Sequence, residues 1–441
     1  MNKLKSFLRG LGLCLIVAVG VAAWTVLPWP ALLLVAVLFA LWMALLRTGR
    51  QASSVTGVGI STLPRRLGAS SVVVIGIAGV VAVLVSLLAM GVGYQQTLSM
   101  SGSADTAVVL RGGSDSEVSS VLDNASTTVI AQAPGIARDA SGKPIASPEL
   151  VVAANLPLND GSGDEGSVQM RGVGDEAWAV RPDVKIIAGR KFKPGLRELV
   201  VGKGAQHEFA GLTPGHEIKL GSQTWTVVGV FESNGAMDSE LWGDANVVAD
   251  TYRRGSSRTS VFVRLTDAAA FGTFKAALAS DPRLQVDATT TLDYFRKQSE
   301  GVTKAITIIG IVVGVIMAIG AVFGALNTMF ATVATRAREI ATLRAIGFRG
   351  LPVVVAVMLE TMLLALIGGA IGGLVAWLLF NGFEASTMAA GSVGKLSFNL
   401  RVSPGLLWEG IKWALAIGFV GGLFPAARAA SLPVTAALRE L

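Results

Sequence analysis

The sequence predicts a polytopic α-helical membrane protein with six spans and a large α+β domain outside the membrane. Three observations support this fold class. Of the 441 residues, 52 % are hydrophobic and only 15 % are charged. Several apolar runs approach or exceed the length of about 17–25 residues that a membrane-spanning helix needs. Residues 101–300 contain no such run, and they carry 25 acidic against 20 basic residues.

The charge of the chain is divided between its parts. Outside residues 101–300 there are 17 Lys and Arg residues and 5 Asp and Glu residues, and most of these cations lie beside apolar runs. The sequence pI of about 9.7 therefore reflects membrane topology and gives no reason to expect nucleic-acid binding. With one cysteine, Cys14, the chain cannot form an internal disulfide. His207 and His216 lack a recognisable ligand spacing, so no metal site is expected.

Residues 1–50 predict an N-terminal transmembrane hairpin. Two apolar runs, 11–27 and 31–46, flank Pro28-Trp29-Pro30, and Trp24 and Trp29 are suited to anchor the turn at the membrane surface. A polar cytoplasmic linker is expected over 51–69. A transmembrane helix follows within 70–96, with its apolar body at 70–92.

Residues 97–290 predict an α+β extracytoplasmic domain. Strands are expected where β-branched or alternating runs lie between turn residues, at 107–110, 127–131, 150–153, 184–187, 199–201, 217–220, 224–231 and 260–265. Ser114 and Glu117 form a capping box that predicts a helix to about 122. A second helix is expected near 268–278, before a strand at 284–286. This order indicates a split ferredoxin-like core with a β-rich insert at about 148–255.

The second half of the chain returns to the membrane. Residues 291–335 predict one long stalk and transmembrane helix, which exceeds the thickness of about 30 Å of a hydrocarbon core. A short cytoplasmic helix is expected over 336–350. Residues 351–424 predict two transmembrane helices, at 353–380 and 404–423, with an outer loop at 382–402, and 425–441 form a cytoplasmic tail.

The short charged helix is the main candidate site. It follows the long helix without a Pro or Gly break and is expected to stop at Gly347. Six of its residues recur at helical spacing and share one face: Arg336, Glu339, Ile340, Leu343, Arg344 and Gly347. A face that mixes charge with two large apolar side chains suits docking on another protein. The alternative is a juxtamembrane basic segment that only sets topology.

Two further features lie within the fifth span. The pairs Gly368/Gly372 and Gly369/Gly373 have the four-residue spacing that lets two helices approach closely, within the bundle or across a dimer. Glu360 is an acidic residue away from the span ends. An intramembrane carboxylate can serve an ion or proton path, or it can pair with an arginine at the inner face.

The positive-inside rule sets the orientation. Thirteen of the 17 cations outside residues 101–300 fall in segments that are expected inside: Lys3, Lys5, Arg9, Arg47, Arg50, Arg65, Arg66, Arg336, Arg338, Arg344, Arg349, Arg428 and Arg439. Both termini are therefore expected in the cytoplasm, with the large domain outside the inner membrane.

Catalytic motifs are not recognised in the sequence. Val201-Gly202-Lys203-Gly204 lacks the spacing of a phosphate-binding loop, and no nucleophile elbow or H-E-x-x-H motif occurs. The chain is therefore not expected to be an enzyme, and any energy for its work must come from a partner.

Residues 335–347, TRAREIATLRAIG, resemble the cytoplasmic element of the MacB/FtsX-type (type VII, mechanotransmission) ABC transporter permeases. Residues 424–430, continuing to Pro433 and 437–439, are similar to the closing signature of that family. Leu359-Glu360, the glycine cluster and the expected hairpin at 215–231 add to the resemblance, which covers about 65–441. The family pattern has four spans, so the N-terminal hairpin is an addition, and the ATPase domain that MacB carries is not found in this sequence.

The resemblance implies an export or extraction machine. Its ATP and Mg would be bound by a separate cytoplasmic ABC ATPase, which would dock on Arg336, Arg338, Glu339, Ile340, Leu343, Arg344 and Gly347. It also implies a second permease copy, most simply in a homodimer, a periplasmic adaptor and membrane lipid as partners. Two alternatives stay open at this point: an FtsX-like regulator of a cell-wall hydrolase, and an ion-coupled carrier that uses Glu360.

Overall fold

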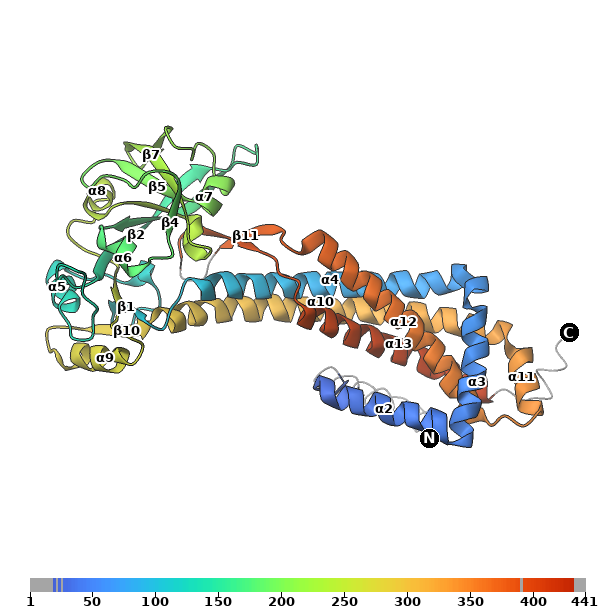
Figure 1. The fold of residues 1–441 in the computed structure, drawn as a ribbon. Coiled ribbons are helices and arrows are strands. Elements are labelled where there is room, and N and C mark those ends of the chain that lie inside the picture. Colours follow the sequence, from blue (N-terminus) through green and yellow to red (C-terminus); the bar gives the residue numbers. More distant parts are fainter. Residues whose placement is uncertain (1–18, 21–22, 25–26, 389–391, 432–441) are drawn as a thin grey trace, which may run out of the picture. The chain divides into compact units, whose positions relative to one another are not determined.

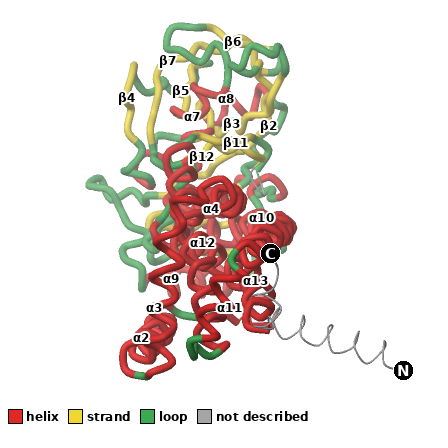
Figure 2. Tube along the Cα trace, turned by 90° about the vertical axis from the view of Figure 1, so that its right-hand side faces the viewer, coloured by secondary structure: helices red, strands yellow, loops and turns green. Residues whose placement is uncertain are grey.

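The computed structural model describes residues 19–20, 23–24, 27–388 and 392–431. The chain forms two compact units. Unit 1 comprises residues 1–89, 307–381 and 401–441, and unit 2 comprises residues 90–306 and 382–400. In the described part of the chain, all strands belong to unit 2, and unit 1 is built from helices (Figures 1 and 2).

In the part of the chain that the structure describes, four helices are long and apolar enough to cross a membrane: α4 (Leu67–Met100), α10 (Thr291–Thr335), α12 (Gly350–Phe380) and α13 (Pro404–Ser431). Within unit 1 they share one buried apolar cluster, to which α4 contributes Ile77, α10 Ala325, α12 Ala365 and α13 Ala414. The spans expected after residue 70 are therefore present as helices. The expected tail is partly helical, because α13 continues through Pro425 to Ser431.

The N-terminal region differs from the expectation at the linker, and the expected hairpin is described only in part. The second apolar run forms α2 (Trp29–Leu45), which is bent by 95° against α3 (Arg47–Thr62). The first run, with Cys14, lies mostly outside the described residues. The segment expected as a polar linker is mainly helical, since α3 and the 3-10 turn η1 (Leu63–Arg66) lead directly into α4. One face of α3 is buried because it packs against α12.

The four predicted packing glycines lie in helix contacts within the chain. A Cβ atom on Gly368 would lie 2.8 Å from the carbonyl oxygen of Val74 on α4, and one on Gly372 would overlap the carbonyl oxygen of Ala78. On the other side of α12, Gly369 faces Ala414 and Gly373 faces Leu407, both on α13. These glycines allow α4 and α13 to approach the α12 backbone closely.

We expect Gly372→Val to destabilise unit 1 by about 1–3 kcal/mol, because the added atoms meet the α4 backbone and force the two helices apart. The measurement is the apparent melting temperature of the full chain in detergent. Gly76→Val on α4 is the matched control, since a Cβ there meets no atom within 4 Å. Equal melting temperatures for the two variants would contradict this account of the glycines.

Unit 2 contains one ten-stranded mixed sheet. Nine strands follow the order β10-β1-β9-β2-β3-β8-β5-β7-β4, and β6 pairs with β7. The strands are β1 (Thr106–Arg111), β2 (Ala146–Pro157), β3 (Glu165–Val173), β4 (Lys185–Gly189), β5 (Glu198–Gly202), β6 (Glu217–Leu220), β7 (Gln223–Glu232), β8 (Glu240–Asp244), β9 (Ser260–Arg264) and β10 (Val286–Thr290).

Four antiparallel strands, β10-β1-β9-β2, form the part of the sheet that we call the core subdomain. Here α5 (Asn124–Ala131) connects β1 to β2, and α9 (Ala270–Ser280) connects β9 to β10. The strand expected at 127–131 is wrong, because this segment is helical. Asp123 caps it by accepting a hydrogen bond from the Ser126 amide at 2.6 Å, and Thr127 and Ile130 point inward at helical spacing.

The helix expected from Ser114 to residue 122 is only the 3-10 turn η2 (Glu117–Ser119). Glu117 does not serve a capping box, since its carboxylate is buried and bound by Arg171. The conformation of this segment therefore follows from the tertiary ion pair of Glu117, and not from the local capping pattern.

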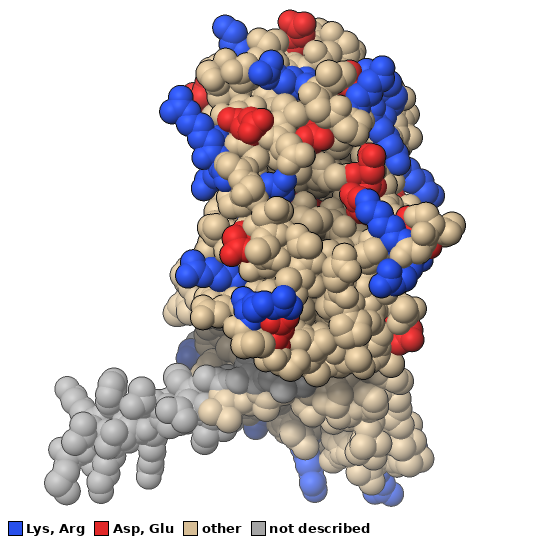
Figure 3. All heavy atoms as spheres, turned by 90° about the vertical axis from the view of Figure 1, so that its left-hand side faces the viewer, with Lys and Arg blue, Asp and Glu red and all other residues tan. Residues whose placement is uncertain are grey.

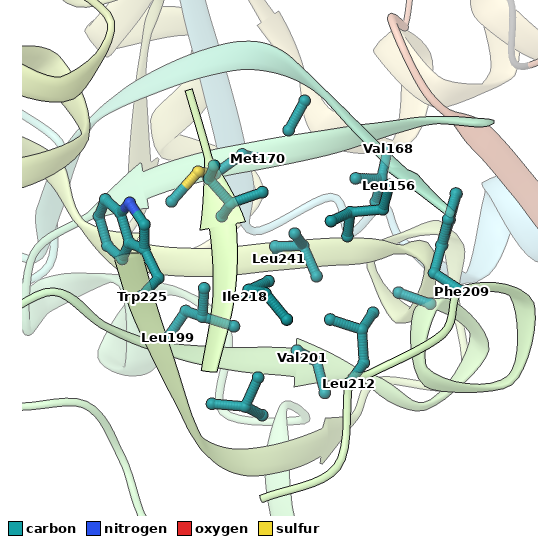
Figure 4. Close-up of a cluster of buried hydrophobic side chains, with 14 of the residues drawn as sticks. Leu156, Val168, Met170, Leu199, Val201, Phe209, Leu212, Ile218, Trp225 and Leu241 are labelled. Carbon is teal, nitrogen blue, oxygen red and sulfur yellow. The ribbon is translucent and has the colours of Figure 1, made fainter. Parts of the chain in front are cut away.

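The remaining strands form the inserted subdomain, between residues 148 and 255. Strand β2 belongs to both parts, because residues 146–149 pair with β9 and residues 150–157 pair with β3. The short helices of the insert are α6 (Glu176–Val180), α7 (Lys203–Glu208) and α8 (Ala245–Thr251), and η3 (Ala236–Ser239) precedes β8. Its apolar core includes Met170, Leu199, Trp225 and Leu241 (Figure 4).

One face of unit 2 carries many charged side chains. Figure 3 shows Lys, Arg, Asp and Glu side chains of both signs spread over one face, with uncharged residues between them. This pattern is typical of a domain in water.

The expected outer loop carries a hairpin of its own, β11 (Glu384–Met388) and β12 (Lys395–Asn399). It belongs to unit 2, although the flanking helices α12 and α13 belong to unit 1.

A buried ion network joins the core subdomain to the insert. Arg171 on β3 is 1 % exposed, and its guanidinium donates to Glu117 (2.7 and 3.0 Å), Glu149 (2.8 Å) and Glu240 (2.7 and 2.8 Å). Arg181 also donates to Glu149, at 2.5 and 2.9 Å. Burial alone would raise the pKa of Glu149, but the charges of Arg181 and Arg171 outweigh it, so this pKa lies below its usual value.

Candidate functional site

The short helix predicted at the inner end of α10 is α11 (Ala337–Ala345). Arg336 lies between α10 and α11 with φ −101° and ψ 7°, so the chain turns there without Pro or Gly. Gly347 has φ +105°, a conformation that favours glycine and ends the helix. The amides of Gly347 and Phe348 close the last turn by donating to the carbonyl groups of Arg344 and Leu343, at 3.2 and 3.1 Å.

A buried ion pair fixes the start of α11 to α12. Arg336 Nη1 lies 2.7 Å from Glu360 Oε2, and both residues are buried, at 8 % and 3 % exposed. Arg336 Nε also donates to Glu339 at 3.1 Å. The sequence left two roles open for Glu360, an ion or proton path and pairing with an inner arginine. In the structure, Glu360 is paired with Arg336. A charge removed from water needs such a partner, and removing one member leaves the other uncompensated.

Helix α3 covers this ion pair. A Cβ on Gly59 would lie 3.1 Å from Glu360 Oε2 and 3.6 Å from the Arg336 guanidinium. Thr56 and Val55 of α3 are also buried. A side chain at position 59 would therefore require the Glu360 carboxylate or α3 to shift by a few tenths of an ångström.

A cavity of about 550 Å³ lies between α3, α11 and α12. Its wall combines the charged groups of Arg336, Glu339 and Glu360 with apolar side chains that include Val55 and Leu343. Helix α11 is therefore tied to α12 at its start but is not packed tightly along its whole length.

The predicted face of α11 is turned partly towards its own chain. Ile340 is 5 % exposed and packs in a cluster with Val333 of α10, Val357 of α12 and Ala426 of α13. Arg336 is buried, and Leu343 and Arg344 are half-buried. The apolar partners of Ile340 on α12 and α13 could not be predicted from the helical pattern of α11 alone.

Other residues of α11 and its C-terminal end remain accessible. Arg338, Glu339, Thr342 and Gly347 are exposed, and Ile346 is exposed at 69 %. Ile346 was not singled out from the sequence. Its exposure could have been predicted from its position, because it is a large apolar residue directly before the glycine that ends the helix, and no following turn covers it.

Metal ligation has no support in the described ranges, where no three His, Cys, Asp or Glu side chains gather into a group that could hold an ion.

Two family models match the chain. Residues 70–281 match the MacB-like periplasmic core domain, and residues 311–434 match the FtsX-like permease C-terminal region. The first includes α4 and most of unit 2, and the second includes α11, α12 and α13. The N-terminal elements α2 and α3 precede both matches.

Curated relatives agree with these models. The macrolide export ATP-binding/permease protein MacB of Bordetella avium is 29 % identical over 398 residues, which cover 83 % of this chain and 57 % of the relative. MacB of Escherichia coli is 25 % identical, with 79 % and 56 % covered. The chain thus spans about half the length of these relatives. The uncharacterized ABC transporter permease YknZ of Bacillus subtilis is 26 % identical, with 90 % and 100 % covered.

Solved structures with similarity include the periplasmic region of MacB from Actinobacillus actinomycetemcomitans, at 14 % identity and a TM-score of 0.33, covering 46 % of this chain and 92 % of that one. The extracellular domain of YknZ from Gram-positive bacteria has 14 % identity and a TM-score of 0.32, with 42 % and 100 % covered.

Proposed function

Because the chain belongs to the MacB/FtsX-type ABC transporter permeases, we propose that it is a transporter membrane subunit that works with a separate ATPase. The observation that carries this proposal is α11, a short charged helix between two candidate spans, with Arg338, Thr342 and Ile346 accessible. The full-length similarity to YknZ, whose name states only a permease, supports a separate ATPase.

In this proposal the ATPase docks on the accessible side of α11, and the ion pair Arg336–Glu360 transmits its movement to α12. The cavity between α3, α11 and α12 gives α11 room to shift. Helix α10 has 45 residues, so it is about 65–70 Å long at 1.5 Å per residue. A helix of this length can carry a displacement from α11 to the outer domain, which would then export or extract a substrate.

The proposed arrangement in the cell has six spans, both termini in the cytoplasm and unit 2 in the periplasm. The distribution of Lys and Arg supports this orientation. The strand order β10-β1-β9-β2 with two crossover helices supports a split ferredoxin-like core. A second copy of the chain, a periplasmic adaptor and membrane lipid remain proposed partners.

The FtsX-like match over residues 311–434 supports a second candidate, in which the same inner helix drives a regulator of a periplasmic cell-wall hydrolase. Both candidates use an ATPase at α11, and they differ in the outer partner. Co-purification of an adaptor favours transport, and co-purification of a hydrolase favours regulation.

We expect Arg338→Glu and Ile346→Glu each to weaken binding of the ATPase by about 1–3 kcal/mol, because an interface residue is replaced by one of wrong charge or polarity. Binding is measured by co-purification of the ATPase with the full chain in detergent. Lys297→Glu is the control, since Lys297 lies in the outer part of α10, in unit 2. Undiminished binding by both α11 variants would remove the support for this docking site.

A further inference from the structure

The hairpin β11–β12, which connects α12 to α13, is docked on the inserted subdomain. Its strand β12, labelled with β3 and α7 in Figure 2, contacts β3, α7 and η3, all of which lie between residues 148 and 255. Leu396 and Phe398 of β12 are each 2 % exposed. The hairpin is therefore packed into unit 2 and is not a free surface loop.

Glu208, at the end of α7, holds both strands of the hairpin. Its Oε1 atom accepts a hydrogen bond from Lys395 Nζ on β12 at 2.8 Å and one from Ser386 Oγ on β11 at 3.1 Å. The Lys395 and Glu208 side chains are only 28 % and 20 % exposed. A partly covered charge pair of this geometry contributes more than a fully solvated one.

Further contacts, of backbone and side chains, also attach the hairpin to the insert. The Ser397 amide donates to Ser239 Oγ of η3 at 2.9 Å. A Cβ on Gly394 would lie 2.5 Å from the Gln169 amide nitrogen of β3, so only glycine permits this approach. Ser392 Oγ donates to the Gln169 side chain at 2.6 Å.

Gln169 connects the hairpin to the buried ion network. Its amide nitrogen Nε2 donates to Glu240 at 2.7 Å, and Glu240 accepts from Arg171. On the other side, the Phe398 ring meets Tyr94 of α4 edge-on at 5.6 Å between ring centroids. The hairpin thus contacts both the outer end of α4 and the insert within unit 2.

We propose that Glu208 and Lys395 are positioning residues that fasten the α12–α13 loop to the insert, so that the insert follows these two helices as well as α4 and α10. This inference rests on the proposed function. Without the Glu208–Lys395 ion pair, force would still reach the outer domain through α4 and α10, but the hairpin would be attached less firmly to the insert.

The test uses Lys395→Glu, Glu208→Lys and the double exchange in the full chain in nanodiscs. Each single reversal places like charges together, and we expect amide exchange at residues 395–399 to accelerate roughly tenfold. We expect each reversal to lower ATP hydrolysis by the complex with the co-purifying ATPase at least about threefold, with ATPase binding unchanged. The double exchange restores both values. Arg190→Glu is the matched control, because it breaks an ion pair with Glu198 (2.6 Å) in the same insert, between two residues outside the hairpin.

Unchanged exchange in both single reversals, or unchanged hydrolysis despite a released hairpin, would overturn the positioning role. The same holds if the double exchange fails to restore exchange. Absence of ATPase binding by the unaltered chain is a different result: it overturns the proposed function, and the exchange measurements then decide by themselves whether the pair fastens the hairpin.

Discussion

Arg171→Met is expected to destabilise unit 2 by about 3–5 kcal/mol at neutral pH, which is the cost of breaking a buried ion network by removing one partner. The methionine fills a similar volume, but Glu117 and Glu240 lose their guanidinium partner while still buried. Amide exchange of β3 and β8 in the full chain measures the loss. Arg197→Met is the control, because Arg197 is exposed and has no ion pair in the described part of the chain.

The stability of unit 2 is also expected to depend on pH. The folded pKa of Glu149 lies below its ordinary value of 4.5, so its ionised form stabilises the fold at pH values above 4.5. This contribution is lost as the pH falls below 4.5. In Arg171→Met, Glu149 loses one of the two arginines that lower its pKa, so the difference in unfolding free energy between this variant and the unaltered chain narrows as the pH falls below 4.5. A difference that is constant from pH 7 to pH 4 would contradict the ionic account.

Arg336→Met is expected to lower the melting temperature of the chain, and ATP hydrolysis by its complex, more than Glu360→Gln does. The first change removes the guanidinium that lies 2.7 Å from the buried Glu360 carboxylate, at a cost of about 3–5 kcal/mol. In the second, the glutamine oxygen can still accept from Arg336, and Arg336 keeps Glu339. The measurements are the melting temperature of the full chain and ATP hydrolysis by its complex. Arg349→Met, at an exposed arginine before α12, is the control for removing a cation.

The same pair of variants tests the carrier alternative. Glu360→Gln cannot bind or release a proton, so an ion-coupled carrier would lose its activity. If Glu360→Gln retains coupling and Arg336→Met loses it, the carboxylate acts as the partner of Arg336. The reverse order of severity would favour the ionisable role.

Local pattern predicted most of the regular elements. The spans after residue 70 follow from apolar runs, and eight of the nine expected strands are present because β-branched residues alternate between turn residues; the one expected at 284–286 begins only at Val286, as β10. The exception, 127–131, shows the limit of propensity: Thr127 and Ile130 are β-branched, yet the Asp123 cap and the position of this segment over the core subdomain made it a helix.

Long-range contacts were not predictable in the same way. The buried ion network of unit 2 takes its residues from four separate elements: Glu117, Glu149, Arg171 and Glu240. In the sequence, each of them resembles an ordinary surface charge. Strands β3 and β8 were missed because neither was distinguished by its local pattern, and they pair with each other across about 70 residues of chain. The helix α3 was missed since its buried face consists of small residues such as Gly49, Ala52 and Gly59.

The sequence by itself determined the membrane class, the separate polar domain, the position of α11 and the glycine that ends it, because these depend on local composition and backbone conformation. Only the tertiary structure decided which side of α11 is free. Ile340 packs against apolar side chains of α12 and α13, and Arg336 pairs with Glu360 of α12, whereas Ile346 is exposed. A helical pattern identifies a face, but what covers that face depends on neighbours that are distant in the chain.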